Sequence, residues 1–573
     1  MPDQSQTSPS AFVCEGGLIK SRSTFIMQPG QALELLNFEP DIEGGYRRIN
    51  GFRKHCNHIV PQTSSSSEKV LMVAFFNNNI VAARGEKIFS SASTELATAI
   101  TSSATMSGSG TITVDSTSGF SSSGTLQIDS EIFTYTGKTS TTFTGVTRAT
   151  GATSAAAHIV DSAVSESWTE RDTGRTNAGK YTFERFNFDG NEKIIVTDGT
   201  NNPTVFNTSF SATDVTESSV EGAKFVTAFK SHMFYAGMSS TPQTLVFSQP
   251  FDEDAFNSGS GAGSIKVDDT IVGMKAFRND LFIFCENRIF KLTGSSSSDF
   301  AITPVTRNIG CINGDTIQEF AGDLIFLGPD GLRTVAGTAR IGDVELGTIS
   351  ANVQSIFDDN LKDSALFESI VIPDKTQYRI FFAKEDVAED NAKGIICVMK
   401  GQNFEFSELR GIKPSATDTF VEAGDVLVLH GGYDGFIHRQ EKGNDFDGTK
   451  VSGRYRSPDL TFGDPGIRKH MQRVIVNYKP ESAINADMFV RYDYEDRNSS
   501  RPAAYPLDSE DVVAIYGTST YGTPTYGGSS EPLLRQSVEG SGFAVALRVN
   551  DNATTAPYSL KGFQLEYQLG ARR

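Results

Sequence analysis

The segment that comes nearest to a phosphate-binding pattern is Gly174–Lys180, which reads GRTNAGK. Glycines at the first and sixth positions before a lysine are typical of a loop whose backbone N–H groups and lysine hold phosphate. The next residue is Tyr181, where that loop requires a serine or threonine to bind Mg²⁺. The following TFERF favours a strand over the helix whose N-terminus would face a phosphate. We therefore expect a polar turn.

Two other segments contain residue types that bind metals. His55–His58 (HCNH) has no second group of ligands at zinc-like spacing, so we expect a surface loop. Asn444–Gly448 (NDFDG) has the acidic start of a calcium loop. The twelfth position counted from Asp445 is Arg456, however, where that loop needs a bidentate acid. We expect an Asp-Gly turn and predict neither a metal nor a cofactor.

Histidines and carboxylates form no complete hydrolytic motif in this sequence. It contains neither G-x-S-x-G nor H-E-x-x-H. His430 and His438 flank Asp434 on one expected hairpin. A hydrolytic site there is the alternative to histidines that pack or face solvent. The adjacent pairs Asp358–Asp359 and Glu495–Asp496 are of a kind that faces solvent more often than it forms a matched acid and base. We predict no catalytic residues and no enzymatic activity.

Three tyrosines recur every five residues in a stretch rich in glycine and threonine: Tyr516, Tyr521 and Tyr526. A tyrosine offers rigid contact area together with a polar end. This stretch is therefore a candidate interaction loop, with a solvated loop that binds nothing as the alternative.

The elements that must position these residues are β-strands. The 573 residues include 41 Phe and 53 Gly but one Trp, a composition that favours strands and turns. Short apolar runs and tight polar turns alternate every few tens of residues, as Val70–Phe76, Asn77–Asn79 and Ile80–Ala83 illustrate. Repeated antiparallel meanders are typical of propeller blades. We predict an all-β fold with a β-propeller of about five to seven blades; a pair of β-sandwiches is the alternative.

Changes in composition divide the chain into four predicted regions. Residues 1–100 form an N-terminal arm and the first propeller strands. Residues 101–167, rich in Ser, Thr and Gly, form a small inserted β module. Residues 168–450 form the remaining blades, with a short amphipathic helix near 350–361 that begins at the N-cap Ser350. Residues 451–573 form a C-terminal sandwich-like β domain that carries the Tyr/Gly loop.

The overall charge and hydropathy exclude some functions. A net charge of -18 and a pI near 5.0 argue against a general nucleic-acid binder, although DNA could pass a negative wall without adhering to it. No run approaches the roughly 20 apolar residues that cross a bilayer, so no membrane insertion is expected. The N-terminus MPDQSQTSPSAF lacks the features of a classical signal peptide. Five scattered cysteines suit free thiols in a reducing cytosol.

Several stretches resemble bacteriophage virion proteins. Leu36–Gly51 matches the pattern L-N-F-E-P-D-x-x-G-G-Y-R-R-x-x-G of the tail nozzle, or tail-stabilisation, proteins of short-tailed, podovirus-like phages. Gly328–Ser350 and the helix after it resemble the blade-plus-helix unit of that family. The insert, with GFSSSGTLQIDSEIFTYTGK, is similar to a β module that recurs in phage structural proteins. The closing Gly562–Tyr567 and Gly570–Arg573 are typical of phage tail chains.

The resemblance implies a structural virion protein, assembled in the host cytoplasm, that forms the distal nozzle of a phage tail. It would be a homo-oligomeric ring of about six subunits that continues the DNA ejection channel. The partners implied are a tail adaptor protein, a tail fibre or spike, and viral DNA that passes without specific binding. A receptor- or glycan-binding tail component is the alternative, and a propeller glycosidase the third hypothesis. The family acts through shape and interfaces, so no binding residue carries over.

Overall fold

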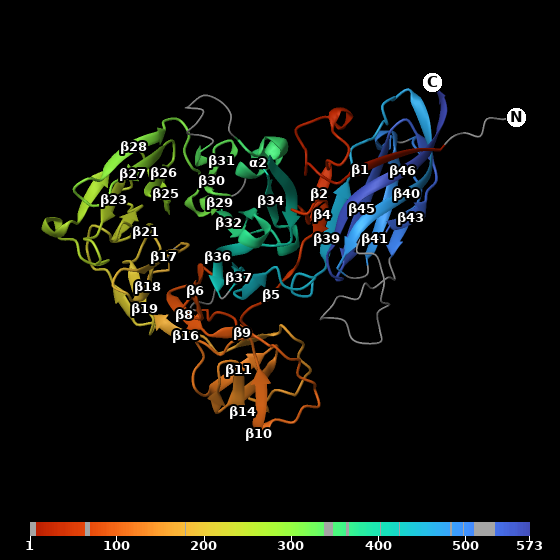
Figure 1. The fold of residues 1–573 in the computed structure, drawn as a ribbon. Helices are drawn as coiled ribbons and strands as arrows, with labels where there is room; N and C mark the ends of the chain where they lie inside the picture. The colour runs from red at the N-terminus through yellow and green to blue at the C-terminus, as the bar shows by residue number, and fades with distance from the viewer. Residues whose placement is uncertain are drawn as a thin grey trace.

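The computed structural model describes residues 7–62, 69–177, 179–336, 348–362, 366–384, 386–401, 403–422, 424–481, 484–496, 498–508 and 533–572. These residues form antiparallel sheets almost throughout, which confirms the predicted all-β class. Figure 1 shows a large ring of sheets, a small module below it and a sandwich at the end that holds both termini.

The ring of sheets is a β-propeller, as predicted. Six separate sheets of three or four strands lie around an axis, and β32–β35 of a nine-stranded sheet complete the ring. Within the ring, the first strands of neighbouring blades contact one another, and η3 (Gly314–Thr316) contacts β25 and β32. The blades, each given from its innermost strand outward, are β6 (Met72–Phe76), β7 (Asn79–Arg84), β8 (Lys87–Ser91) and β16 (Thr169–Asp172); β17 (Thr182–Asn187), β18 (Glu192–Thr197), β19 (Thr204–Asn207) and β20 (Ala212–Asp214); β21 (Phe225–Phe229), β22 (His232–Ala236), β23 (Thr244–Phe247) and β24 (Gly263–Lys266); β25 (Ile271–Phe277), β26 (Asp280–Cys285), β27 (Ile289–Thr293) and β28 (Ala301–Thr306); β29 (Gln318–Phe320), β30 (Asp323–Gly328) and β31 (Gly331–Thr334); β32 (Leu366–Ile372), β33 (Gln377–Ala383), β34 (Lys393–Lys400) and β35 (Asn403–Arg410); and β36 (Pro414–Glu422), β37 (Asp425–Gly432), β38 (Ile437–Gln440) and β5 (Phe52–Lys54).

Local turn chemistry explains the hairpins inside the blades. Between β6 and β7, Asn77 and Asn78 have φ values of 45° and 58°. Two consecutive left-handed residues make the type I′ turn that matches strand twist, and asparagine tolerates this conformation. The hairpin predicted from the apolar runs on either side is confirmed.

Two blades are completed by strands that lie far away in sequence. β5 pairs with β38, with Lys54 opposite His438, so the N-terminal segment supplies the outer strand of the last blade. β16 pairs with β8 only after the whole inserted module has intervened. The propeller therefore closes by long-range pairing.

The inserted module is a separate sheet with its own core. Its strands are β9 (Ser93–Glu95), β10 (Ser107–Thr113), β11 (Gly124–Ile128), β12 (Glu131–Tyr135), β13 (Gly137–Lys138), β14 (Thr142–Thr150) and β15 (Ala163–Ser165). Inside it, buried His158 contacts Asp129 at 2.7 Å and Glu131 at 2.9 Å, while Arg148 forms two hydrogen bonds with Glu131. The module begins at Ser93, earlier than the predicted residue 101.

The C-terminal region is a sandwich of two sheets, and the N-terminal strands belong to it. One sheet contains β1 (Thr7–Val13), β3 (Phe38–Pro40), β4 (Tyr46–Arg48), β40 (Ile467–Pro480), β43 (Leu533–Ser537), β44 (Ser541–Gly542) and β46 (Tyr558–Arg572). The other contains β2 (Glu34–Leu36), β39 (Val451–Arg456), β41 (Asn485–Tyr492), β42 (Tyr505–Asp508) and β45 (Val545–Ala553). The predicted N-terminal arm is thus built into the sandwich.

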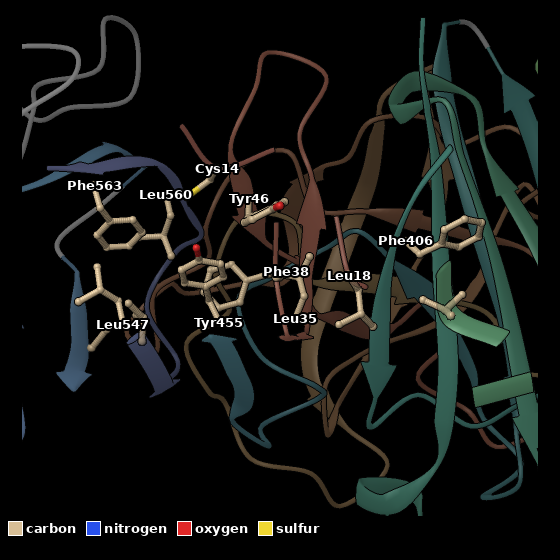
Figure 2. Packing of buried hydrophobic residues seen from close by; sticks show 14 of the residues in the cluster. Cys14, Leu18, Leu35, Phe38, Tyr46, Phe406, Tyr455, Leu547, Leu560 and Phe563 are labelled. Atoms are coloured by element: carbon tan, nitrogen blue, oxygen red, sulfur yellow. The ribbon is translucent and has the colours of Figure 1, made fainter. Parts of the chain in front are cut away.

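Propeller and sandwich share one continuous sheet and one core. β2 pairs in parallel with β35, with Leu36 opposite Glu408, and antiparallel with β39. Figure 2 shows the core running from Phe406 of the propeller past Leu18 and Leu35 to Tyr455 and Phe563 of the sandwich. Because sheet and core are continuous, the two parts form one body.

The predicted helix is present, but the role of its N-cap differs. η4 (Ala351–Val353) leads into α2 (Gln354–Leu361), whose Phe357 is fully buried. The hydroxyl of Ser350 makes no capping bond to the helix; it accepts a hydrogen bond from the Leu332 N–H at 3.1 Å. Ser350 therefore holds the helix segment against β31.

All five cysteines are free and buried, as expected. Burial raises the pKa of the Cys14 thiol to about 12, which keeps it protonated and unreactive. No helix within the described ranges combines the length and apolar character needed to span a membrane.

Candidate functional site

The stretch Leu36–Gly51, called the joint motif below, lies where the propeller meets the sandwich. The Asn37 side chain donates to the carbonyls of Arg410 in the propeller and Ser452 in the sandwich, at 3.1 and 3.0 Å. Asn37 has a φ of 52°, a conformation that asparagine tolerates better than most residues. One side chain therefore connects both parts of the molecule.

A buried charge network centres on Glu39 of the joint motif. Its carboxylate contacts Lys375 at 2.6 Å, Arg47 at 3.0 Å and the fully buried Arg379 at 3.4 Å. Arg379 also contacts Glu441 at 2.5 Å. Although burial opposes its ionisation, Arg379 and Lys375 lower the pKa of Glu441 to about 2. The network therefore holds strands β3 and β4 of the sandwich against blade strand β33.

Arg48 forms a second buried connection. Its side chain is fully buried 3.5 Å from Asp551, which is also fully buried. Its guanidinium donates to the carbonyls of Ala553 at 2.9 Å, Asn444 at 3.4 Å and Thr555. Burial raises the pKa of Asp551, and Arg48 opposes that rise. Arg48 is thus the counter-ion that compensates a buried carboxylate.

Gly51 ends the joint motif because no side chain fits there. A Cβ at this position would lie 1.7 Å from the carbonyl oxygen of Asp445. The contacts of the joint motif are therefore structural: they fix how two β bodies are held together, and they leave no group positioned for chemistry.

A second concentration of charge lies on the propeller axis, on or beside the innermost strands. We call it the axial cluster; it consists of Lys180, Glu184, Arg185, Lys275, Asp315, Glu368 and Asp418. Lys180 forms ion pairs with Asp315 at 3.2 Å and with Glu368, on blades across the ring. Arg185 pairs with Asp418, whose carboxylate also accepts the Phe75 N–H at 2.8 Å. Opposite charges thus meet across the axis of each propeller.

Burial and the neighbouring Asp315 raise the pKa of Glu368 to about 8, although Lys180 opposes the rise. A carboxyl with such a pKa can donate a proton near neutrality, which is the property of a general acid. Its hydrogen bonds go to Lys180 and Thr417, however, so its contacts are satisfied inside the protein. Carboxylates do converge at the axis, where the sequence showed no motif for a glycosidase.

Glu368→Gln is expected to change how stability depends on pH. A raised folded-state pKa gives stability that is present below the unfolded value near 4.5 and lost as pH rises through about 8. Glutamine mimics the protonated form, so the variant should match wild type near pH 5 and melt at a higher temperature near pH 8.5. Thermal unfolding across this range measures the difference, with Glu170→Gln in a surface ion pair as control. A difference that does not vary with pH would contradict the assignment.

The phosphate-loop pattern does not form a phosphate site. Lys180, the lysine of that pattern, is engaged in the axial cluster. Arg175 forms ion pairs with Asp172 at 2.8 Å and Asp198 at 3.1 Å, and Tyr181 is buried before strand β17. The predicted strand after the pattern is confirmed.

His430 and His438 pack instead of forming a hydrolytic site. Their rings stack with centroids 5.0 Å apart, and both lie edge-on against Phe52. His438 contacts Asp434 at 3.2 Å, whereas neither ring nitrogen of His430 has a hydrogen-bond partner. Burial lowers the pKa of His430 well below its usual value, so this imidazole is neutral.

His55–His58 connects the propeller to the inserted module, a role that its sequence did not reveal. The Asn57 side chain donates to the carbonyls of Gln127 and Ala163 at 2.9 and 2.6 Å. The indole of Trp168 donates to the His58 carbonyl at 2.9 Å. His55 and Cys56 are buried, so the expectation of a surface loop was wrong for them.

The remaining candidate residues show no site chemistry. The Asp445 carboxylate accepts the Gly448 N–H at 2.9 Å, which confirms the Asp-Gly turn. Within the described ranges, no group of three or more His, Cys, Asp or Glu could hold a metal ion. The pair Asp358–Asp359 is exposed on α2. Tyr516, Tyr521 and Tyr526 lie outside the described residues.

Comparison with known proteins supports the fold class and no more. The sequence matches no family model and no curated protein. Similar solved structures include a quinonprotein alcohol dehydrogenase-like protein from Bacteroides thetaiotaomicron (6% identity, 61% of this chain and 67% of that one, TM-score 0.29). Others are the Pan2 WD40 domain from Neurospora crassa (8%, 66% and 90%, 0.28) and an exo-β-1,3-galactanase from Phanerochaete chrysosporium (7%, 78% and 95%, 0.22). At such values the propeller assignment rests on strand pairing, and these proteins' activities are not transferred.

Proposed function

We propose that this chain is a structural protein of a phage virion that forms the distal nozzle of a short tail. In this proposal a ring of about six copies docks on the tail adaptor and continues the DNA ejection channel. The chain acts without catalysis, and its net charge of -18 lets DNA pass without specific binding.

The observation that carries the proposal is the position of the joint motif. The residues that resemble the nozzle family are those that join propeller and sandwich into one body, through Asn37, Glu39 and Arg48. A subunit that transmits load through a tail requires a rigid connection between its parts. The axial cluster supports the same reading, because ion pairs occupy the axis of each propeller. In this proposal the channel lies between subunits.

Imaging tests this proposal. Negative-stain images of the full chain, alone and mixed with the adaptor ring, are expected to show closed rings stacked coaxially on the adaptor. Trimeric particles would favour the receptor- or glycan-binding alternative. Hydrolysis of a glycan by a monomer would favour an enzyme.

A further inference from the structure

Four arginines gather on the outward face of the sandwich strands β39, β41 and β45. We call this the arginine face; it consists of Arg454, Arg456, Arg491 and Arg548. Arg456 stands directly opposite Arg548 across the β39–β45 pair. Like charges in this position destabilise a sheet. Their concentration in so acidic a chain therefore calls for an anionic partner.

The chain's own carboxylates satisfy these arginines poorly. Glu34 lies 3.7 Å from Arg454 and 3.9 Å from both Arg456 and Arg548. Glu495 lies 3.9 Å from Arg456 and 3.7 Å from Arg491. A hydrogen-bonded guanidinium–carboxylate pair has N···O distances of about 2.7–2.9 Å. The face can therefore bind further carboxylates, and Arg454, with 42% of its side chain exposed, is the most accessible.

The best complement on the molecule is Phe251–Asp254, between β23 and η2 (Ser258–Ser260), called the acidic tip. Phe251 is 57% exposed and has a φ of 65°, which turns the chain outward. Glu253 pairs with Lys193 at 2.5 Å. Asp252 and Asp254 hydrogen-bond to each other, which raises the pKa of Asp254 and lowers that of Asp252. Within the described ranges, neither aspartate forms an ion pair.

The two features lie at opposite ends of the molecule. In Figure 1 the blade β21–β24 is at the far left, whereas β39, β41 and β45 are in the sandwich at the right. The acidic tip therefore cannot reach the arginine face of its own chain. Two different patches at opposite ends make a head-to-tail contact, which generates a ring when its rotation closes.

We propose that the acidic tip of one subunit binds the arginine face of the next subunit. This inference rests on the proposed ring and identifies its subunit contact. Asp252 and Asp254 accept hydrogen bonds from the guanidinium groups, of which Arg454 and Arg548 are the outermost to test. The exposed Phe251 ring adds apolar contact beside Phe489, over which Arg491 lies at 4.8 Å. The charges also orient subunits as they meet.

Charge reversal on each side tests the contact in the full chain. Asp252→Lys/Asp254→Lys and Arg454→Glu/Arg548→Glu should each weaken assembly on the adaptor at least ten-fold, as measured by sedimentation. Mixing the two variants one to one should restore rings, because each reversed patch then meets a complementary one. Such alternating rings need an even number of subunits, which about six satisfies. The exposed Asp189→Lys/Glu221→Lys variant has the same charge change and should assemble like wild type.

Each other outcome overturns the inference. If either reversed variant assembles as wild type does, the contact lies elsewhere. If both fail alone and the mixture also fails, the two patches do not pair. Wild-type chains that form no ring with the adaptor would overturn the proposed function together with this contact, whereas wild-type rings without rescue overturn the contact alone.

Discussion

Arg48→Met is expected to lower the free energy of unfolding by about 3–5 kcal/mol. The substitution removes the counter-ion of Asp551 and leaves a carboxylate buried with no cation. It also removes donors to the carbonyls of Ala553, Asn444 and Thr555. Urea unfolding, followed by circular dichroism, measures the loss.

Two variants make this first prediction specific. Arg48→Met/Asp551→Asn should recover part of the stability, because the buried negative charge is removed with its partner. Arg288→Met breaks an exposed ion pair with Asp268 and should cost less than about 1 kcal/mol. An Arg48→Met effect no larger than that of Arg288→Met would contradict the buried role.

Arg379→Met should be comparably severe, at about 3–5 kcal/mol, because Glu39 and Glu441 would lose the guanidinium between them. It should also change the response to acid. The lowered pKa of Glu441 gives stability that is present above about 4.5 and lost as pH falls toward 2. Without Arg379 that pKa rises, so the variant should unfold at a higher pH than wild type.

Acid titration of both proteins, monitored by circular dichroism, measures this shift. Arg333→Met offers a matched control, since its partner Asp330 is half exposed and adjacent in the fold. If the acid midpoint of Arg379→Met stays at the wild-type value, the network around Glu39 does not hold the joint in the way described.

Local patterns in the sequence were sufficient to predict the blades but not how they close. Thr244–Phe247 coincides with β23, and Lys193–Thr197 lies within β18, because alternating burial and tight turns are encoded over a few residues. The pairing of β5 with β38 and of β1 with β46 joins segments hundreds of residues apart. Local periodicity contains no information about such partners, so the N-terminal strands were assigned to the wrong body.

The buried charges left a signal that could have been used. Glu368 interrupts the apolar run LFESIVI, and Arg379 interrupts YRIFF. A charged residue inside a strand whose neighbours are all buried requires a buried partner, because an unpaired charge there is costly. The sequence can thus identify Glu368 and Arg379 as paired residues. It cannot name Lys180 or Glu39 as their partners, which only the ring of blades brings near.

The central claim, a self-assembling ring, is tested most directly by the mass of the full chain in solution after addition of the adaptor ring. Analytical ultracentrifugation should find a discrete complex with about six copies of this chain, the number that closed cyclic symmetry around a tail would give. A chain that stays monomeric in the presence of the adaptor would contradict the nozzle.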